Sequence, residues 1–220
     1  MALSYQDIKN NEEIRIYIKK ADQSLEALGY TEHAFAHMTK TAITAAEILE
    51  KTGYPERTIE LARIAGYMHD IGNVINRTDH AQSGAVMAFR ILDKLGMPAD
   101  EVSTVICAIG NHDESTAFPV NEVAAALILA DKSDVRRSRV RNQDFSTFDI
   151  HDRVNYAVTE SDLQLDMEAG TITLSLTIDT AISSVMEYFE IFLERMLLCK
   201  KAASALGLEF NLIMNRQEIL

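Results

Sequence analysis

The sequence contains no tryptophan and only two cysteines, three prolines and nine glycines among its 220 residues. So few turn-forming residues argue against a protein built from many short strands and tight turns. The two cysteines, Cys107 and Cys199, form no C-x-x-C pair, so we expect free thiols rather than a disulfide framework. The longest uninterrupted apolar run, 123–130, is far shorter than the roughly 20 residues that a membrane-spanning helix needs. Because its first residues also lack a basic and apolar leader, the sequence predicts a cytoplasmic protein without a membrane segment.

Basic residues are in the minority, with 21 Lys and Arg against 33 Asp and Glu and a net charge of −12. An acidic surface repels a phosphate backbone, so we expect no general binding of nucleic acid. A local cluster of cations can outweigh the net sign, which leaves small phosphorylated molecules open as ligands. Apolar residues are plentiful, at 47% of the chain, and are sufficient for one sizeable core.

Apolar residues recur at helical spacing through most of the first 160 residues. Gly29 stands where the first predicted helix would end, Thr31 can cap the second, and Pro55 can open the third. The predicted helices cover 12–28, 31–51, 55–68, 84–95, 98–109 and 121–130.

The pattern changes near residue 160. Apolar and polar residues alternate over 163–167 and 171–178, with a Glu-Ala-Gly turn between them, and this period of two predicts a β-hairpin. Helical periodicity returns over 180–206, and beyond Gly207 we recognise no pattern. We therefore predict a mainly α fold with two parts. They are a helical domain over 1–155 and, over 156–220, a hairpin plus long helix that serves packing or oligomerisation.

The last predicted helix is apolar on nearly every side of its middle turns, where Phe189, Phe192, Leu193 and Met196 follow one another closely. A helix of this kind is normally buried all round, and two strands alone are only marginally stable in water. We expect its second apolar stripe to be buried in a homodimer. The alternative is that the hairpin covers this stripe within the same chain.

The pair His69-Asp70 follows a helical face that includes Ala65 and Met68. An imidazole and a carboxylate at the end of a buried helix are costly unless they pair or bind a metal. Alone, the pair fits a hydrogen-bonded structural role as well as it fits a metal site. His37, on the preceding predicted helix, adds a second imidazole and favours the metal site.

Asp131 directly follows the longest apolar run, and helical spacing places it on the same face as Leu127 and Ile128. A buried carboxylate without a partner shifts its pKa and becomes neutral at a cost, which a bound cation would remove. Two imidazoles and two carboxylates together suit Mn, Fe, Co, Ni or Zn better than Ca.

The order His, His-Asp, Asp in these four residues resembles the motif of the HD-superfamily metal-dependent phosphohydrolases. The surrounding residues YMHDIGN and LADKSD resemble that family as well. So do two elements typical of its binuclear branches: HAQSGA, which begins at His80, and NHDE, which contains His112. The resemblance covers about residues 30–140 and implies an HD-domain helical bundle.

The resemblance implies one or two divalent metal ions, of Mn, Fe, Co, Ni, Zn or Mg. The implied ligands are His37, His69, Asp70, His80, His112 and Asp131. Asp70 would bridge to a second ion held by His80 and His112. Asn73 stands where many binuclear members have a lysine, and Asn111 replaces a histidine, so the number of ions stays open.

The reaction that the resemblance implies is hydrolysis of a phosphate ester or anhydride, with a nucleotide as the favoured substrate. A metal lowers the pKa of bound water from about 15.7 toward 7 and offsets charge on the phosphoryl oxygens. Asp70 and Asp113 are the predicted catalytic carboxylates. Asp113, or its neighbour Glu114, would act as general acid or base because both follow His112.

Three residues are predicted to contact the substrate phosphate. His33 shares a helix face with His37, and a surface position is the alternative for it. A basic cluster occupies 132–141, where arginine forks can recognise phosphate. Lys132 and Arg137 are its best candidates, because their spacing from the last aspartate resembles a dinucleoside-polyphosphate-hydrolysing branch. Cations that complement a helix C-terminus are the alternative.

Two other functions remain open at this point. Some HD-fold proteins use a similar ligand set to activate oxygen, so a di-iron oxygenase is one alternative. A non-catalytic nucleotide-binding or regulatory module is the other, with the hairpin and final helix as its interaction part.

Overall fold

The computed structural model describes residues 2–114 and 116–220. Its helices are α1 (Tyr5–Asn10), α2 (Glu12–Ala27), α3 (Phe35–Lys51), α4 (Glu56–Met68), α5 (His80–Lys94), α6 (Ala99–Gly110), α7 (Glu122–Lys132), α8 (Ile150–Ala157) and α9 (Val185–Ala205). Short 3₁₀ helices are η1 (Ile71–Val74), η2 (Arg137–Arg139) and η3 (Phe145–Thr147). The strands are β1 (Val158–Asp166), β2 (Thr171–Ile178), β3 (Glu209–Met214) and β4 (Gln217–Glu218). The predicted mainly α fold is therefore confirmed.

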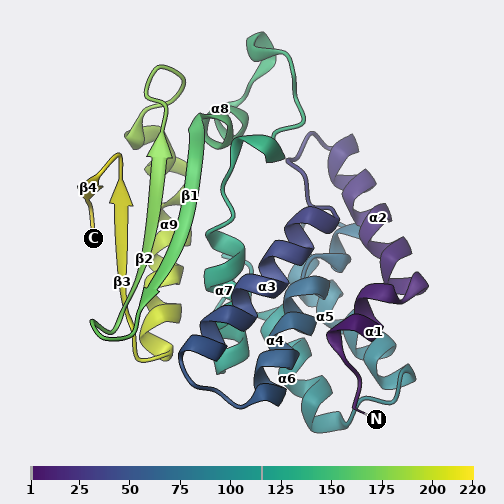
Figure 1. The fold of residues 1–220 in the computed structure, drawn as a ribbon. Helices are drawn as coiled ribbons and strands as arrows, with labels where there is room; N and C mark the ends of the chain where they lie inside the picture. Colours follow the sequence, from purple (N-terminus) through teal and green to yellow (C-terminus); the bar gives the residue numbers. More distant parts are fainter. Residues whose placement is uncertain (1, 115) are drawn as a thin grey trace.

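Helix α7 lies at the centre of the molecule, where it contacts α3, α4 and α6 on one side and α9 on the other (Figure 1). Every residue over 123–130 is buried, which explains the uninterrupted apolar run at this position. Asp131 and Lys132 follow directly on the same helix. The most apolar segment of the chain therefore positions two charged side chains in the interior.

The sheet is larger than the sequence predicts. The antiparallel hairpin of β1 and β2 is present, but β3 pairs in parallel with β2, and β4 pairs with β3 in antiparallel orientation. Helix α9 connects β2 to β3 and packs against the sheet (Figure 1). The tail beyond Gly207, where we recognised no pattern, carries an alternation of buried Phe210, Leu212 and Met214 that marks β3.

Several predicted helix boundaries are wrong. Helix α3 begins at Phe35, and Thr31 does not cap it. The Glu32 N–H instead donates a hydrogen bond to the Arg139 carbonyl, which holds the segment before α3 against Arg139. Helix α5 begins at His80 rather than at residue 84. The last helix begins only at Val185, where Ser184 and Glu187 form a capping box.

The apolar stripes of α9 are covered mostly within the same chain. Tyr188, Phe192 and Met196 are buried, and α9 contacts both α7 and β3. Leu193 and Leu197, one turn apart, stay exposed. These contacts support coverage within one chain for most of the helix, while the homodimer stays a prediction.

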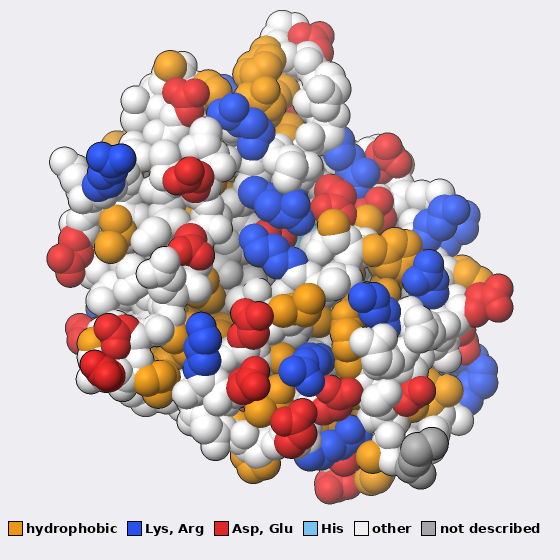
Figure 2. Space-filling model, in the orientation of Figure 1, with side chains coloured by type: hydrophobic (Ala, Val, Ile, Leu, Met, Phe, Trp, Pro, Cys, Tyr) orange, Lys and Arg blue, Asp and Glu red, His pale blue; other side chains and the backbone are white. Residues whose placement is uncertain are grey.

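Buried side chains of the helical part and of the sheet part form one continuous core. The predicted division of the chain at residue 155 stays a prediction. Acidic and basic side chains are interspersed over the face in Figure 2, so the net charge is not gathered into one patch there. Among the described residues, no helix has the length and apolarity to cross a membrane.

Candidate metal centre

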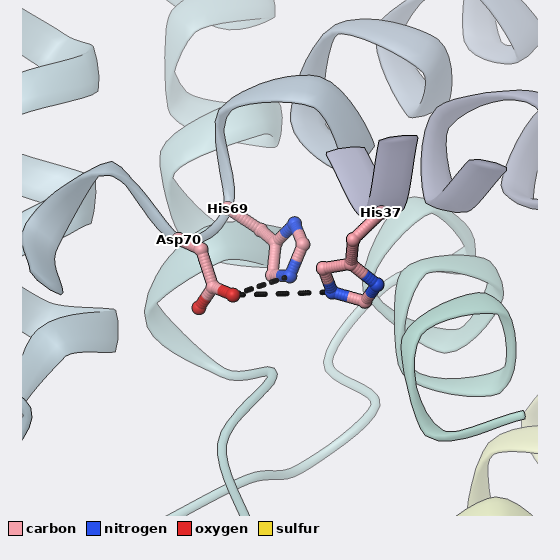
Figure 3. Close-up of side chains that lie close together, drawn as sticks. All are labelled: His37, His69 and Asp70. Carbon is pink, nitrogen blue, oxygen red and sulfur yellow. Dashed lines mark ion pairs between the residues drawn. The ribbon is translucent and has the colours of Figure 1, made fainter. Parts of the chain in front are cut away.

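Close helix packing brings His37 and His69 together. A Cβ atom on Gly66 would lie 2.7 Å from the Cα atom of Ala42, so only glycine lets α4 approach α3 this closely. His37 projects from α3 and His69 from the end of α4, and their ring centroids are 5.2 Å apart. Figure 3 shows both imidazoles turned toward Asp70, the next residue in the chain after His69.

A second close approach brings His80 to the same place. A Cβ atom on Gly72 would lie 2.0 Å from the carbonyl oxygen of His80 and 2.5 Å from the nitrogen of Gly84. The turn after Asp70 can therefore pack directly on the start of α5. His112 arrives from the end of α6, and its ring centroid lies 5.1 Å from that of His80.

The two oxygens of Asp70 face two different groups of imidazoles. Its Oδ2 lies 3.3 Å from Nε2 of His69 and 3.9 Å from Nε2 of His37. The same two nitrogens lie 3.6 Å and 3.3 Å, respectively, from Oδ1 of Asp131. On the other side, Asp70 Oδ1 lies 3.2 Å from Nε2 of His80 and 3.7 Å from Nε2 of His112. The structure thus brings all six predicted ligands together, with Asp70 between two groups.

The orientation of each imidazole follows from the partner of its Nδ1. All four Nδ1 atoms lie within hydrogen-bond distance of an oxygen that can only accept, so in the neutral ring Nδ1 carries the proton and Nε2 has the lone pair. These pairs are His37 with Asp134 Oδ2 at 2.8 Å, His69 with the Gly66 carbonyl at 2.8 Å, His80 with the Arg77 carbonyl at 3.0 Å, and His112 with the Ile109 carbonyl at 2.6 Å. All four lone pairs then point toward the carboxylates.

This arrangement fits a divalent cation. The Nε2 atoms of His37 and His69 are buried and have no hydrogen-bond partner among the described residues. Burial alone would lower the pKa of His69, but the carboxylates of Asp70 and Asp131 raise it to about 10, so without a metal ion a proton occupies the position on Nε2 that a cation would take. One cation would satisfy both lone pairs and both carboxylates, and mixed N and O ligands suit a transition metal.

Asp134 is a residue that the sequence analysis missed. It is completely buried and accepts a hydrogen bond from His37 at 2.8 Å. Lys40 Nζ lies 2.8 Å and Arg136 Nε 2.9 Å from its Oδ1. Burial opposes its charge, yet His37 and Arg139 hold the pKa of Asp134 far below its usual range. Its spacing, three residues after Asp131, is a signal that could have found it.

A cavity of about 810 Å³ opens onto the metal centre. Asp70, Asp131 and the imidazoles of His33, His80 and His112 line one part of it. Four cations also line it: Arg77, Lys132, Arg139 and Arg195. Other walls come from residues 28–31, from α8 and from residues 189–195 of α9.

The structure brings two of the three predicted phosphate contacts into this cavity. His33 Nε2 lies 4.0 Å from Asp70 Oδ2, while its Nδ1 faces the Thr31 carbonyl at 2.7 Å. Lys132 is buried, with its Nζ 2.7 Å from Oδ2 of Asp131. Arg137 is not among the lining residues, because the chain turns at η2 and directs it elsewhere.

Arg137 instead donates a hydrogen bond to the Tyr156 carbonyl at 2.6 Å, and its guanidinium lies over the ring of Tyr156. Arg139, two residues later, reaches the cavity and is buried there. Its Nε donates to the Glu32 carbonyl and its Nη1 to the Asp134 carbonyl. A spacing pattern could not distinguish these two arginines.

Of the two carboxylates after His112, Glu114 lines the cavity and Asp113 is not among the lining residues. The carboxylate of Glu114 lies between two cations, at 3.1 Å from Lys132 Nζ and 2.5 Å from Arg195 Nε. Burial opposes its charge, but Lys132 and Arg195 hold the pKa of Glu114 well below its usual range. Such a carboxylate is ionised and cannot supply a proton as a general acid near neutral pH.

Comparison with known proteins finds a family match and two similar proteins. The sequence matches the HD domain family over residues 34–143. An uncharacterized protein from Methanocaldococcus jannaschii is 25% identical over 159 residues, which are 62% of this chain and 61% of that protein. The chain therefore spans less than two thirds of this curated relative. A predicted HD superfamily hydrolase from an uncultured Thermotogales bacterium is 25% identical, with a TM-score of 0.45, over 56% of this chain and 67% of that one.

Proposed function

The chain belongs to the HD domain family, and we propose that it is a metal-dependent phosphohydrolase that acts on a small phosphate ester or anhydride. The observation that carries this proposal is the pair of buried Nε2 atoms of His37 and His69. They have no hydrogen-bond partner among the described residues and face two carboxylates beside a cavity lined by cations.

His37, His69, Asp70 and Asp131 would hold the metal ion. When bound, a divalent cation lowers the pKa of a coordinated water molecule toward 7 and offsets negative charge on a phosphoryl group. Asp134 orients His37 through its Nδ1. Lys132 holds Oδ2 of Asp131 at 2.7 Å, so that Oδ1 is the oxygen that faces the imidazoles. These contacts fix the ligands before any substrate arrives.

The cavity supports an anionic substrate larger than inorganic phosphate. Its volume, about 810 Å³, falls in the range of roughly 300–1,000 Å³ that is typical of small-molecule sites. Lys132, Arg77 and Arg139 supply positive charge next to the metal centre. Tyr30 and Phe189 also line the walls and offer aromatic surface. A nucleotide fits this arrangement, because its phosphate would lie at the metal and its base among the aromatic side chains.

Metal analysis followed by a phosphate-release screen tests the proposal. We expect the purified protein to contain a transition metal and to release phosphate from at least one nucleotide in the presence of Mn²⁺, Co²⁺, Ni²⁺ or Mg²⁺. Replacing Asp93, an exposed carboxylate on α5, by asparagine should leave both properties unchanged and serves as the control. A protein that binds none of these metals and releases no phosphate from any phosphorylated compound would refute the proposal.

A further inference from the structure

The two groups of imidazoles around Asp70 are not equivalent. In the first group, the buried Nε2 atoms of His37 and His69 have no hydrogen-bond partner among the described residues. In the second group, Nε2 of His80 already has a donor, because Nη1 of Arg77 lies 3.3 Å from it. Asp70 shows the same contrast, since its Oδ1, which faces the second group, accepts a hydrogen bond from the Asn73 amide at 3.0 Å.

Arg77 contacts both nitrogens of the His80 ring. Its backbone carbonyl lies 3.0 Å from Nδ1 of His80 and fixes the proton there. Its guanidinium then meets the lone pair on Nε2 and also lies 3.5 Å from Oδ1 of Asn73. The guanidinium is further placed over the ring of Tyr30, at 5.6 Å from the centroid. A guanidinium keeps its charge at any pH that a folded protein tolerates.

From this asymmetry we propose that Arg77 takes the place of a second metal ion. The chain binds one divalent cation tightly through His37, His69, Asp70 and Asp131. In the second group, the guanidinium of Arg77 contacts Nε2 of His80 and the amide of Asn73 donates to Oδ1 of Asp70 instead. A second cation would have to displace Arg77 from Nε2 of His80 and would meet its positive charge at short range. The second group is therefore a weak site, although its donors have the spacing of metal ligands.

The stoichiometry of Mn²⁺ binding tests this role, and the inference rests on the metal centre of the proposed function but not on hydrolysis. Equilibrium dialysis of the full chain should give one tightly bound Mn²⁺. The variant Arg77→Met should bind two, with the affinity of the second site raised at least tenfold. Electron paramagnetic resonance should then show an exchange-coupled Mn²⁺ pair in the variant and an isolated Mn²⁺ ion in the parent.

Two further variants keep this experiment decisive. Arg195→Met removes the same charge from the same cavity, but Arg195 contacts Glu114, so it should leave the Mn²⁺ stoichiometry at one. Arg77→Lys retains a positive charge and should bind no more Mn²⁺ than the parent. Circular dichroism and thermal unfolding with a chelator present verify that each variant is folded.

Three results would overturn proposals made for this site, and they are distinguishable. If the parent and Arg77→Met bind two Mn²⁺ ions with equal affinities, Arg77 does not replace a metal. If Arg195→Met strengthens the second site as much as Arg77→Met does, the effect is one of overall charge, and direct competition by Arg77 is refuted. If the parent binds no Mn²⁺ or other divalent transition metal at all, the metal centre of the proposed function fails as well.

Discussion

Replacing Asp134 by asparagine should weaken metal binding although Asp134 is not itself a ligand. Its buried carboxylate accepts a hydrogen bond from Nδ1 of His37 at 2.8 Å and thereby directs Nε2 toward Asp70 and Asp131. Of the four imidazoles at the centre, His37 alone has a carboxylate as its Nδ1 partner, and the other three face backbone carbonyls. A carboxylate partner makes an imidazole a stronger donor to a metal than a carbonyl does.

The expected loss of metal affinity depends on whether each substitution keeps an acceptor oxygen for His37. Loss of such a partner typically lowers metal affinity by about 10-fold to 100-fold, which corresponds to roughly 1.4 to 2.8 kcal/mol. Asparagine retains an acceptor oxygen for His37 but loses the charge, so Asp134→Asn should fall near the lower limit. Asp134→Ala removes the acceptor as well and should fall near the upper limit.

Competition with a fluorescent chelator measures the Mn²⁺ affinity of the parent and both variants. Asp93→Asn, an exposed change of the same chemistry, provides the control. Lys40 and Arg136 also lose their partner, so thermal unfolding is measured with chelator present to detect any loss of folding. Folded variants that bind Mn²⁺ as tightly as the parent would show that Asp134 does not tune His37. Equal losses in both variants would contradict the graded argument.

Four other outcomes are expected. Asp70→Asn should abolish both metal content and phosphate release while helical circular dichroism persists; substantial activity in the variant would exclude Asp70 as the shared ligand. Lys132→Ala should raise KM for a phosphorylated substrate severalfold, whereas Arg137→Ala should leave it unchanged, since Arg137 lies outside the cavity. Burial raises the pKa of the Cys199 thiol to about 12, so it should resist alkylation at pH 8 until the chain unfolds; rapid labelling of the native protein would contradict its burial. Light scattering should show a homodimer that Leu197→Glu dissociates, and a monomeric parent at micromolar concentration would refute the dimer.

The metal ligands could be predicted because each is tied to a local pattern. His69 and Asp70 follow a buried helix, and Asp131 lies in the last turn of α7, directly after the buried residues 123–130. An imidazole or carboxylate at such a position requires a partner whatever the rest of the fold does. Helical spacing then predicted which face of each helix carries the ligands. It misplaced the start of α3 by four residues, because nothing in the local sequence indicates the contact between Glu32 and Arg139.

The residues around the ligands could not be predicted, because their partners are distant in sequence. Glu114 lies between Lys132 and Arg195, which come from two different helices. Neither its burial nor its charge can be inferred from a loop sequence. Strand β3 could not be predicted for the same reason. Its apolar alternation is short, and its pairing partner β2 precedes it in the chain by the whole of α9.

The walls of the cavity come partly from the span that matches the HD domain family and partly from segments outside it. The implied ligands lie within residues 34–143, the span that matches the HD domain family. Walls of the same cavity come from outside that span, at residues 28–33, in α8 and at 189–195. The family match therefore bears on the metal centre, and it carries little information about which molecule fills the remaining space. Arg195 lies outside the matched span and contacts Glu114. Glu114 in turn contacts Lys132, which is next to the implied ligand Asp131. Members of the family that share the ligands but differ in these walls would present different cavities to their substrates.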